Sequence, residues 1–70
     1  MYIGQKVRLL DNYMDPSFEK HWAGITGIIV GITKSFLLPG LQYQVEFYDT
    51  KEGKKVVRRF RNKELEKIYE

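Results

Sequence analysis

The stretch from Gly24 to Phe47 constrains this chain more than any other part of the sequence. Residues 24–33 are apolar at nearly every position that is not glycine, so neither side of this segment can face solvent throughout. That pattern is typical of a curved central strand shared by two sheets, and its glycines permit the coiling and bulging that such a strand needs. A ten-residue helix is the competing interpretation, but three glycines among β-branched residues favour a strand.

A second strand is predicted over residues 41–48, where apolar and polar side chains alternate. The odd positions from Leu41 to Phe47 are apolar and fall on one face. The sequence Asp-Thr-Lys-Glu-Gly at 49–53 then predicts a hairpin turn whose glycine supplies a positive φ. Residues 54–60 form the returning strand, and because its parity is internally inconsistent we expect a bulge in its second half, between Val57 and Phe60.

The two ends of the chain add shorter elements. Residues 3–10 alternate as a half-buried strand with Ile3 inward, and Gly4 permits a bend at its start. Residues 61–65 predict one helical or 3₁₀ turn, and residues 66–69 a last short strand. The core is expected to contain six apolar side chains: Val7, Ile29, Ile32, Val45, Phe47 and Leu65.

Residues 11–21 lack an apolar period and predict one long loop with room for a helical turn after Pro16. The expected fold is therefore all-β, a small five-stranded, strongly bent antiparallel barrel with one late 3₁₀ turn. Seventy residues allow one domain, 1–70. The absence of cysteine and of a secretory signal pattern favours the cytoplasm, and no segment is long and apolar enough to cross a membrane.

This strand order resembles the Src-homology-3-like barrels over nearly the whole chain. The closer resemblance is to KOW-type and photosystem-accessory barrels, on motifs at Gly4–Arg8, Gly24–Ile32, Tyr43–Phe47 and Phe60–Leu65. These positions are mostly structural, and such barrels host nucleic-acid binding, peptide binding and docking alike. The chain departs from the peptide-binding members, because it lacks a proline near Leu65. The resemblance implies a non-enzymatic binding module.

Charge gives the strongest indication of a partner. Residues 51–63 hold seven basic side chains against one acid, +6, while the rest of the chain carries −3. We call these seven residues the basic hairpin. Their density is suited to a phosphate backbone, and an outward Tyr48 is suited to stacking on a base. The expected nucleic-acid-binding residues are Tyr48, Lys54, Lys55, Arg58, Arg59, Arg61 and Lys63.

The alternative is that the basic residues only protect a strand edge, with Glu46, Glu64 and Glu66 as their ion-pair partners. If the basic hairpin does bind a partner, charge alone leaves RNA, DNA and an acidic protein open, and the chain is expected to be a monomer or a weak homodimer.

A protein-docking surface is the second candidate function. One version uses the acidic, aromatic loop 11–22; the other uses the apolar loop 36–38. In each case a structural interpretation competes: the rings cover an open end of the barrel, or the apolar loop plugs it. The expected protein-interaction residues are Tyr13, Phe18, Trp22, Phe36, Leu37 and Leu38.

No residue set predicts catalysis. His21 is the single histidine, so a metal site would depend on carboxylates such as Asp15 and Glu19, and a lone loop histidine is more often solvated. Ser17 and Ser35 have no base nearby in sequence, and Gly53-Lys54 lacks the frame of a phosphate-binding loop. We therefore expect no enzymatic activity, no metal and no cofactor.

Overall fold

The computed structural model describes residues 1–12, 16–34 and 40–69. Within these ranges the chain forms five strands and two 3₁₀ turns and has no α-helix, which confirms the all-β prediction. The predicted residues Tyr13, Asp15, Phe36, Leu37 and Leu38 lie outside the described residues. The elements are β1 (Lys6–Leu9), η1 (Lys20–Trp22), β2 (Thr26–Lys34), β3 (Leu41–Asp49), β4 (Lys54–Arg61), η2 (Asn62–Glu64) and β5 (Leu65–Lys67).

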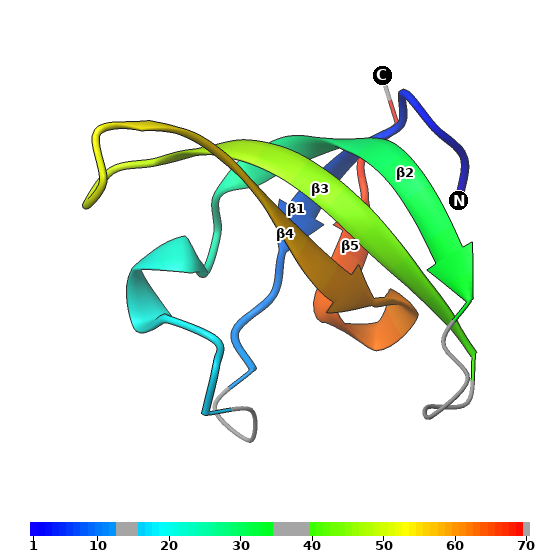
Figure 1. The fold of residues 1–70 in the computed structure, drawn as a ribbon, viewed down its shortest axis with the longest axis horizontal. Coiled ribbons are helices and arrows are strands. Elements are labelled where there is room, and N and C mark those ends of the chain that lie inside the picture. Colours follow the sequence, from blue (N-terminus) through cyan, green and yellow to red (C-terminus); the bar gives the residue numbers. More distant parts are fainter. Residues whose placement is uncertain (13–15, 35–39, 70) are drawn as a thin grey trace.

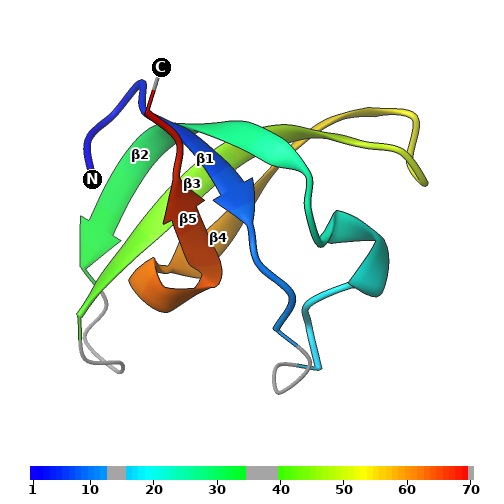
Figure 2. The same cartoon turned by 180° about the vertical axis from the view of Figure 1, so that it is seen from behind.

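The strands of the described residues make one antiparallel sheet in the order β4-β3-β2-β1-β5. The sheet bends strongly. In Figure 1, β2, β3 and β4 cross the side nearest the viewer, and in Figure 2, which is the view from behind, β1 and β5 lie nearest. Because β4 and β5 remain the two edges, the barrel is bent but not closed. β2 pairs with both β1 and β3 and is the curved central strand, although within one sheet rather than between two.

Two glycines allow β2 to coil against β3. A Cβ on Gly27 would lie 2.6 Å from the Glu46 carbonyl oxygen and 2.7 Å from a Val45 methyl, so only glycine fits at this crossing. The register between β2 and β3 shifts between Ile29 and Gly31, which is the kind of bulge that the glycines were expected to permit. Close backbone approach thus explains the glycine at position 27.

The core lies inside the bend. Of the six predicted core residues, Ile32 is only partly buried and the other five are buried. Phe18 and Trp22 also pack there, with ring centroids 5.6 Å apart in an edge-to-face arrangement. Phe18 and Trp22 are therefore core side chains, which agrees with the structural interpretation of these two rings. The buried apolar residues are Val7, Leu9, Phe18, Trp22, Ile29, Tyr43, Val45, Phe47, Val56, Phe60 and Leu65.

The first strand is shorter than predicted. Gly4 adopts φ +94° in a turn, and the strand begins only at Lys6. Ile3, expected inward, is 63% exposed because this turn breaks the alternation before the strand starts. The last strand begins one residue earlier than predicted, at Leu65, directly after η2.

The returning strand β4 also differs from expectation. Its register against β3 runs without a shift from Lys54 to Arg61, so the bulge predicted between Val57 and Phe60 is wrong. The inconsistent parity has another cause: Arg58 occupies an inward position opposite Val45 but stays exposed, because β4 is an edge strand. An edge leaves room for a long cation to reach solvent past the core.

The turn η1 and the β3–β4 hairpin turn both line a groove between the long loop and β4. The helical turn of the long loop lies at η1 and not directly after Pro16. The hairpin turn between β3 and β4 forms as predicted, with Gly53 at φ +71° and its N–H donating to the Asp49 carbonyl oxygen at 2.8 Å. Across the described residues, no helical segment has the length and apolar character needed to span a membrane.

Candidate nucleic-acid interface

The cations of the basic hairpin are all exposed. The register of β4 against β3 sorts those on the strand into two sets. Lys55, Arg59 and Arg61 pair with outward-facing residues of β3 and lie on the outer face of the sheet, the face turned away from the core. Lys54 and Arg58 have the opposite parity. The predicted binding residues therefore do not form one surface, and the outer face holds the larger part.

Tyr48 belongs to the outer face as predicted. It pairs with Lys55 across β3 and β4, and its side chain is 52% exposed. Cross-strand neighbours on one face have Cβ atoms about 5 Å apart, so a phenol ring and a cation stand side by side here. Lys63 lies apart from this row, in η2.

The carboxylates expected to neutralise the hairpin mostly do not reach it. In the described part of the chain Lys55 is the one hairpin cation in an ion pair, to Glu46 Oε1 at 4.0 Å. Glu64 is buried and accepts the Arg61 backbone N–H at 3.1 Å, which caps η2. Glu66 pairs with Arg8 on β1 at 3.7 Å. The positive charge of the outer face is thus largely uncompensated by neighbouring acids.

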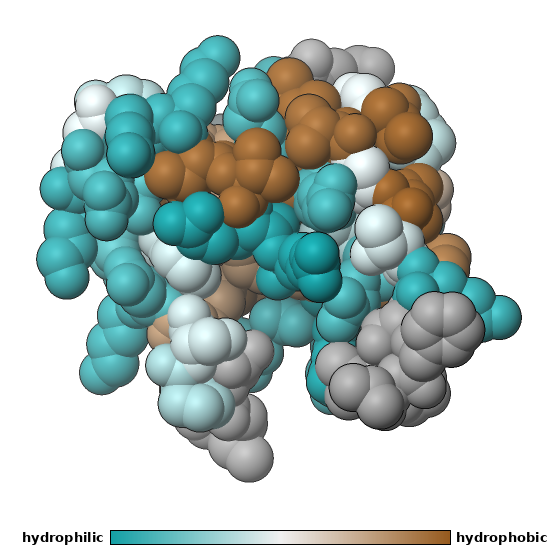
Figure 3. Space-filling model, viewed as in Figure 1, coloured by the Kyte–Doolittle hydropathy of each residue, from teal (hydrophilic) through white to brown (hydrophobic). Residues whose placement is uncertain are grey.

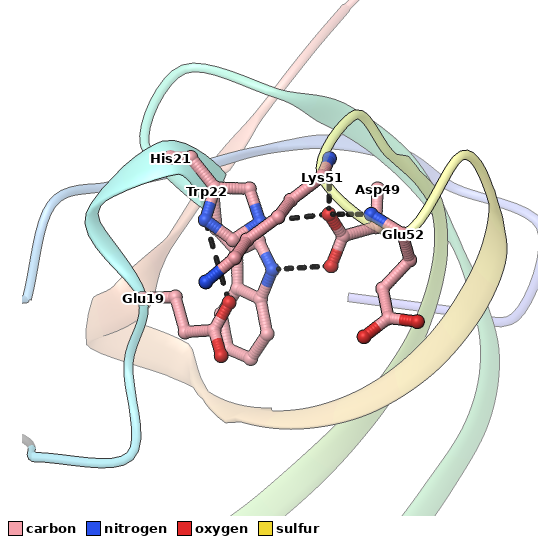
Figure 4. A network of polar contacts seen from close by, with 6 residues as sticks. All are labelled: Glu19, His21, Trp22, Asp49, Lys51 and Glu52. Atoms are coloured by element: carbon pink, nitrogen blue, oxygen red, sulfur yellow. Dashed lines mark hydrogen bonds and ion pairs between the residues drawn. The ribbon is translucent and has the colours of Figure 1, made fainter.

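A buried carboxylate holds the hairpin against the long loop (Figure 4). Asp49 is 1% exposed, and its Oδ2 accepts the indole N–H of Trp22 at 3.0 Å. Its Oδ1 lies 2.7 Å from His21 Nε2 and accepts the backbone N–H groups of Lys51 at 2.9 Å and Glu52 at 3.2 Å. This single side chain joins β3, its turn and η1.

These contacts set the protonation of Asp49. Burial alone would raise the pKa of the carboxyl group, but hydrogen bonds from Trp22, His21 and the backbone of the turn outweigh it and hold the pKa well below its ordinary value of 3.8. Asp49 is therefore a carboxylate at neutral pH, and its charge is satisfied by donors inside the fold.

His21 lies between two carboxylates and is not simply solvated. Its Nδ1 is 3.3 Å from Glu19 Oε2, on the side of the ring away from Asp49. The ligand atoms of Glu19, His21 and Asp49 lie within 4.8 Å of one another, so among the described residues Asp49 joins the Glu19–His21 pair that the sequence suggested. However, both oxygens of Asp49 already accept hydrogen bonds. These contacts serve to hold η1 against β3 and the hairpin turn.

A groove of about 670 Å³ separates η1 from β4. Its lining includes Glu19 and Glu52 as well as Arg58 and Arg59. Arg58 also donates from Nη1 to the Val57 carbonyl oxygen at 2.9 Å. Acidic side chains therefore share this groove with both arginines, although among the described residues neither arginine forms an ion pair with Glu19 or Glu52.

Sequence reasoning missed the role of Asp49, which it treated only as a turn residue. A signal was present, because an Asp that opens a turn commonly accepts the N–H groups that follow it. Its contacts with His21 and Trp22 depend on tertiary pairing, which local patterns do not carry.

The fold and this surface define a class: a small all-β protein with one bent, five-stranded antiparallel sheet and a basic edge strand. Searches against protein-family models, curated proteins and solved structures find no significant match for the chain.

Proposed function

We propose that this protein is a non-enzymatic module that binds nucleic acid through the outer face of β3 and β4. Lys55, Arg59 and Arg61 contact phosphates, with Lys54, Arg58 and Lys63 adding longer-range attraction. Tyr48 stacks on a base. The interaction is electrostatic at long range, and no bond is made or broken.

One observation carries this proposal: Arg59 and Arg61 stand exposed on the same face as Tyr48, and in the described residues neither side chain has a carboxylate partner. Cations kept only to protect an edge would serve equally well when paired with acids, as Lys55 is with Glu46. The strand order with a 3₁₀ turn before β5 further supports the resemblance to Src-homology-3-like and KOW-type barrels. A cytoplasmic location is part of the same proposal.

The test is fluorescence anisotropy with labelled oligonucleotides. We expect binding that weakens several hundred-fold on duplex DNA between about 50 and 200 mM salt if about five phosphates are neutralised. The double variant Arg59→Gln and Arg61→Gln should lower both the affinity and the salt dependence. The matched control removes two exposed cations elsewhere, Lys20→Gln and Lys34→Gln, and should change both much less.

Two results would contradict the proposal. If no oligonucleotide binds at low salt, the arginines serve as edge protection and nucleic acid is not the partner. If both double variants weaken binding equally, net charge alone is responsible and β3 and β4 form no site.

A further inference from the structure

The outer face also carries apolar side chains. Ile28 is 46% exposed, Tyr48 52% and Val57 44%. The sheet register places Ile28 and Val57 on either side of Glu46, so these side chains lie in one row across β2, β3 and β4. Figure 3, which views the molecule as in Figure 1, shows brown patches set among teal residues on this side.

Exposed apolar side chains beside cations favour one form of nucleic acid over the other. A duplex keeps the faces of its bases inside the helix and offers a protein mainly phosphates and groove edges. A single strand exposes base faces that stack on aromatic rings and cover apolar side chains, while its phosphates still need cations. A face that carries both exposed apolar groups and uncompensated arginines matches the second ligand.

We infer that the outer face binds single-stranded polynucleotide in preference to duplex, an inference that rests on the proposed function. The bases lie over Ile28, Tyr48 and Val57, and the phosphates follow the cations of β4. Glu46 at the centre of the row, in an ion pair with Lys55 at 4.0 Å, disfavours phosphate and accepts hydrogen bonds from base N–H groups, which keeps the backbone on the β4 side. From Lys55 to Arg61 the strand extends about 20 Å, enough for a short run of nucleotides.

The experiment compares labelled oligonucleotides of about twelve nucleotides, a length within the range of single-strand sites. Oligo-dT and oligo-U are the single strands, and a duplex of the same length is the reference. We expect tighter binding of both single strands than of the duplex. Tyr48→Ala should weaken single-strand binding by about tenfold and leave duplex binding unchanged. Tyr69→Ala, at an 80% exposed tyrosine, is the matched control and should have no effect.

A second variant protects the test against a fold defect. Val57→Ser changes an exposed residue and should also weaken single-strand binding selectively, with an unchanged far-ultraviolet circular dichroism spectrum. Equal affinities for single strand and duplex would overturn this inference while the proposed function stands. A single-strand preference that Tyr48→Ala and Val57→Ser both leave intact would overturn the assignment to this face. No binding of any oligonucleotide at low salt would overturn both proposals.

Discussion

Asp49 shows how one buried charge can organise a domain with a small core. An unpaired buried carboxylate is costly, but four hydrogen bonds satisfy this one, and all its donors come from η1 and the β3–β4 turn. The contact with Trp22 also fixes the position of this ring in the core. Removing the charge should therefore affect the loop and the turn together.

Asp49→Asn tests this. In one orientation of the new amide its NH₂ group faces the Trp22 indole N–H, and in the other it faces His21 and the backbone N–H groups of the turn. Because a donor meets a donor in both cases, the variant should unfold more easily at pH 7. Because the folded-state pKa of Asp49 lies below 3.8, its contribution to stability is complete above that pH and declines as pH falls below it. The difference between wild type and variant should thus shrink in acid, as measured by urea unfolding from pH 7 to 3.

Glu52→Gln is the matched control, since this exposed residue contributes its backbone N–H to Asp49 and should tolerate loss of its side-chain charge. A free energy of unfolding for Asp49→Asn equal to that of wild type at pH 7 would mean that the network does not stabilise the fold. A difference that stays constant down to pH 3 would mean that its charge is not the cause.

At the level of elements, the sequence predicted the strands well because strand periodicity is local. Alternation located β3, the Asp-Thr-Lys-Glu-Gly sequence located the hairpin turn, and glycine content indicated that β2 could bulge, without giving the position. It failed where position in the sheet decides the outcome: an inward Arg58 remains solvated only because β4 is an edge. The division of the cations between two faces depends on the pairing of β4 with β3. The sequence therefore named the candidate residues but not the face on which each one lies.

The crossing of β2 and β3 supplies the prediction at this scale. Gly27→Ala places a methyl group against the Glu46 carbonyl oxygen and Val45, and paired backbones cannot move apart cheaply. We expect a loss of about 1 to 3 kcal/mol in the free energy of unfolding, the usual range for overpacking. Thermal or urea unfolding measures it.

Gly31→Ala is the control for this prediction. There the new methyl group would meet the Gln44 side chain, which can rotate away, so the cost should be smaller. Equal losses for the two variants would point to glycine-specific backbone effects in β2. In that case close packing against β3 would not explain Gly27.

For the whole molecule, the uneven charge matters more than the net charge. The chain carries +3 overall, but +6 of charge lies between residues 51 and 63 and the remainder is negative. Under the proposed function, such a dipolar distribution would orient an approaching polyanion toward the hairpin before contact. Stacking on Tyr48, in contrast, would act only once the strand is bound. The two parts of the outer face should therefore control different rates.

We expect Arg59→Gln combined with Arg61→Gln to lower the association rate constant and to flatten its dependence on salt. Tyr48→Ala should instead raise the dissociation rate constant by about tenfold and leave the salt dependence of association as in wild type. Stopped-flow fluorescence with a labelled single strand separates the two constants. Lys20→Gln with Lys34→Gln controls for net charge. If Tyr48→Ala slows association as strongly as the arginine variant does, the ring takes part in the encounter itself, and the division between steering and stacking is wrong.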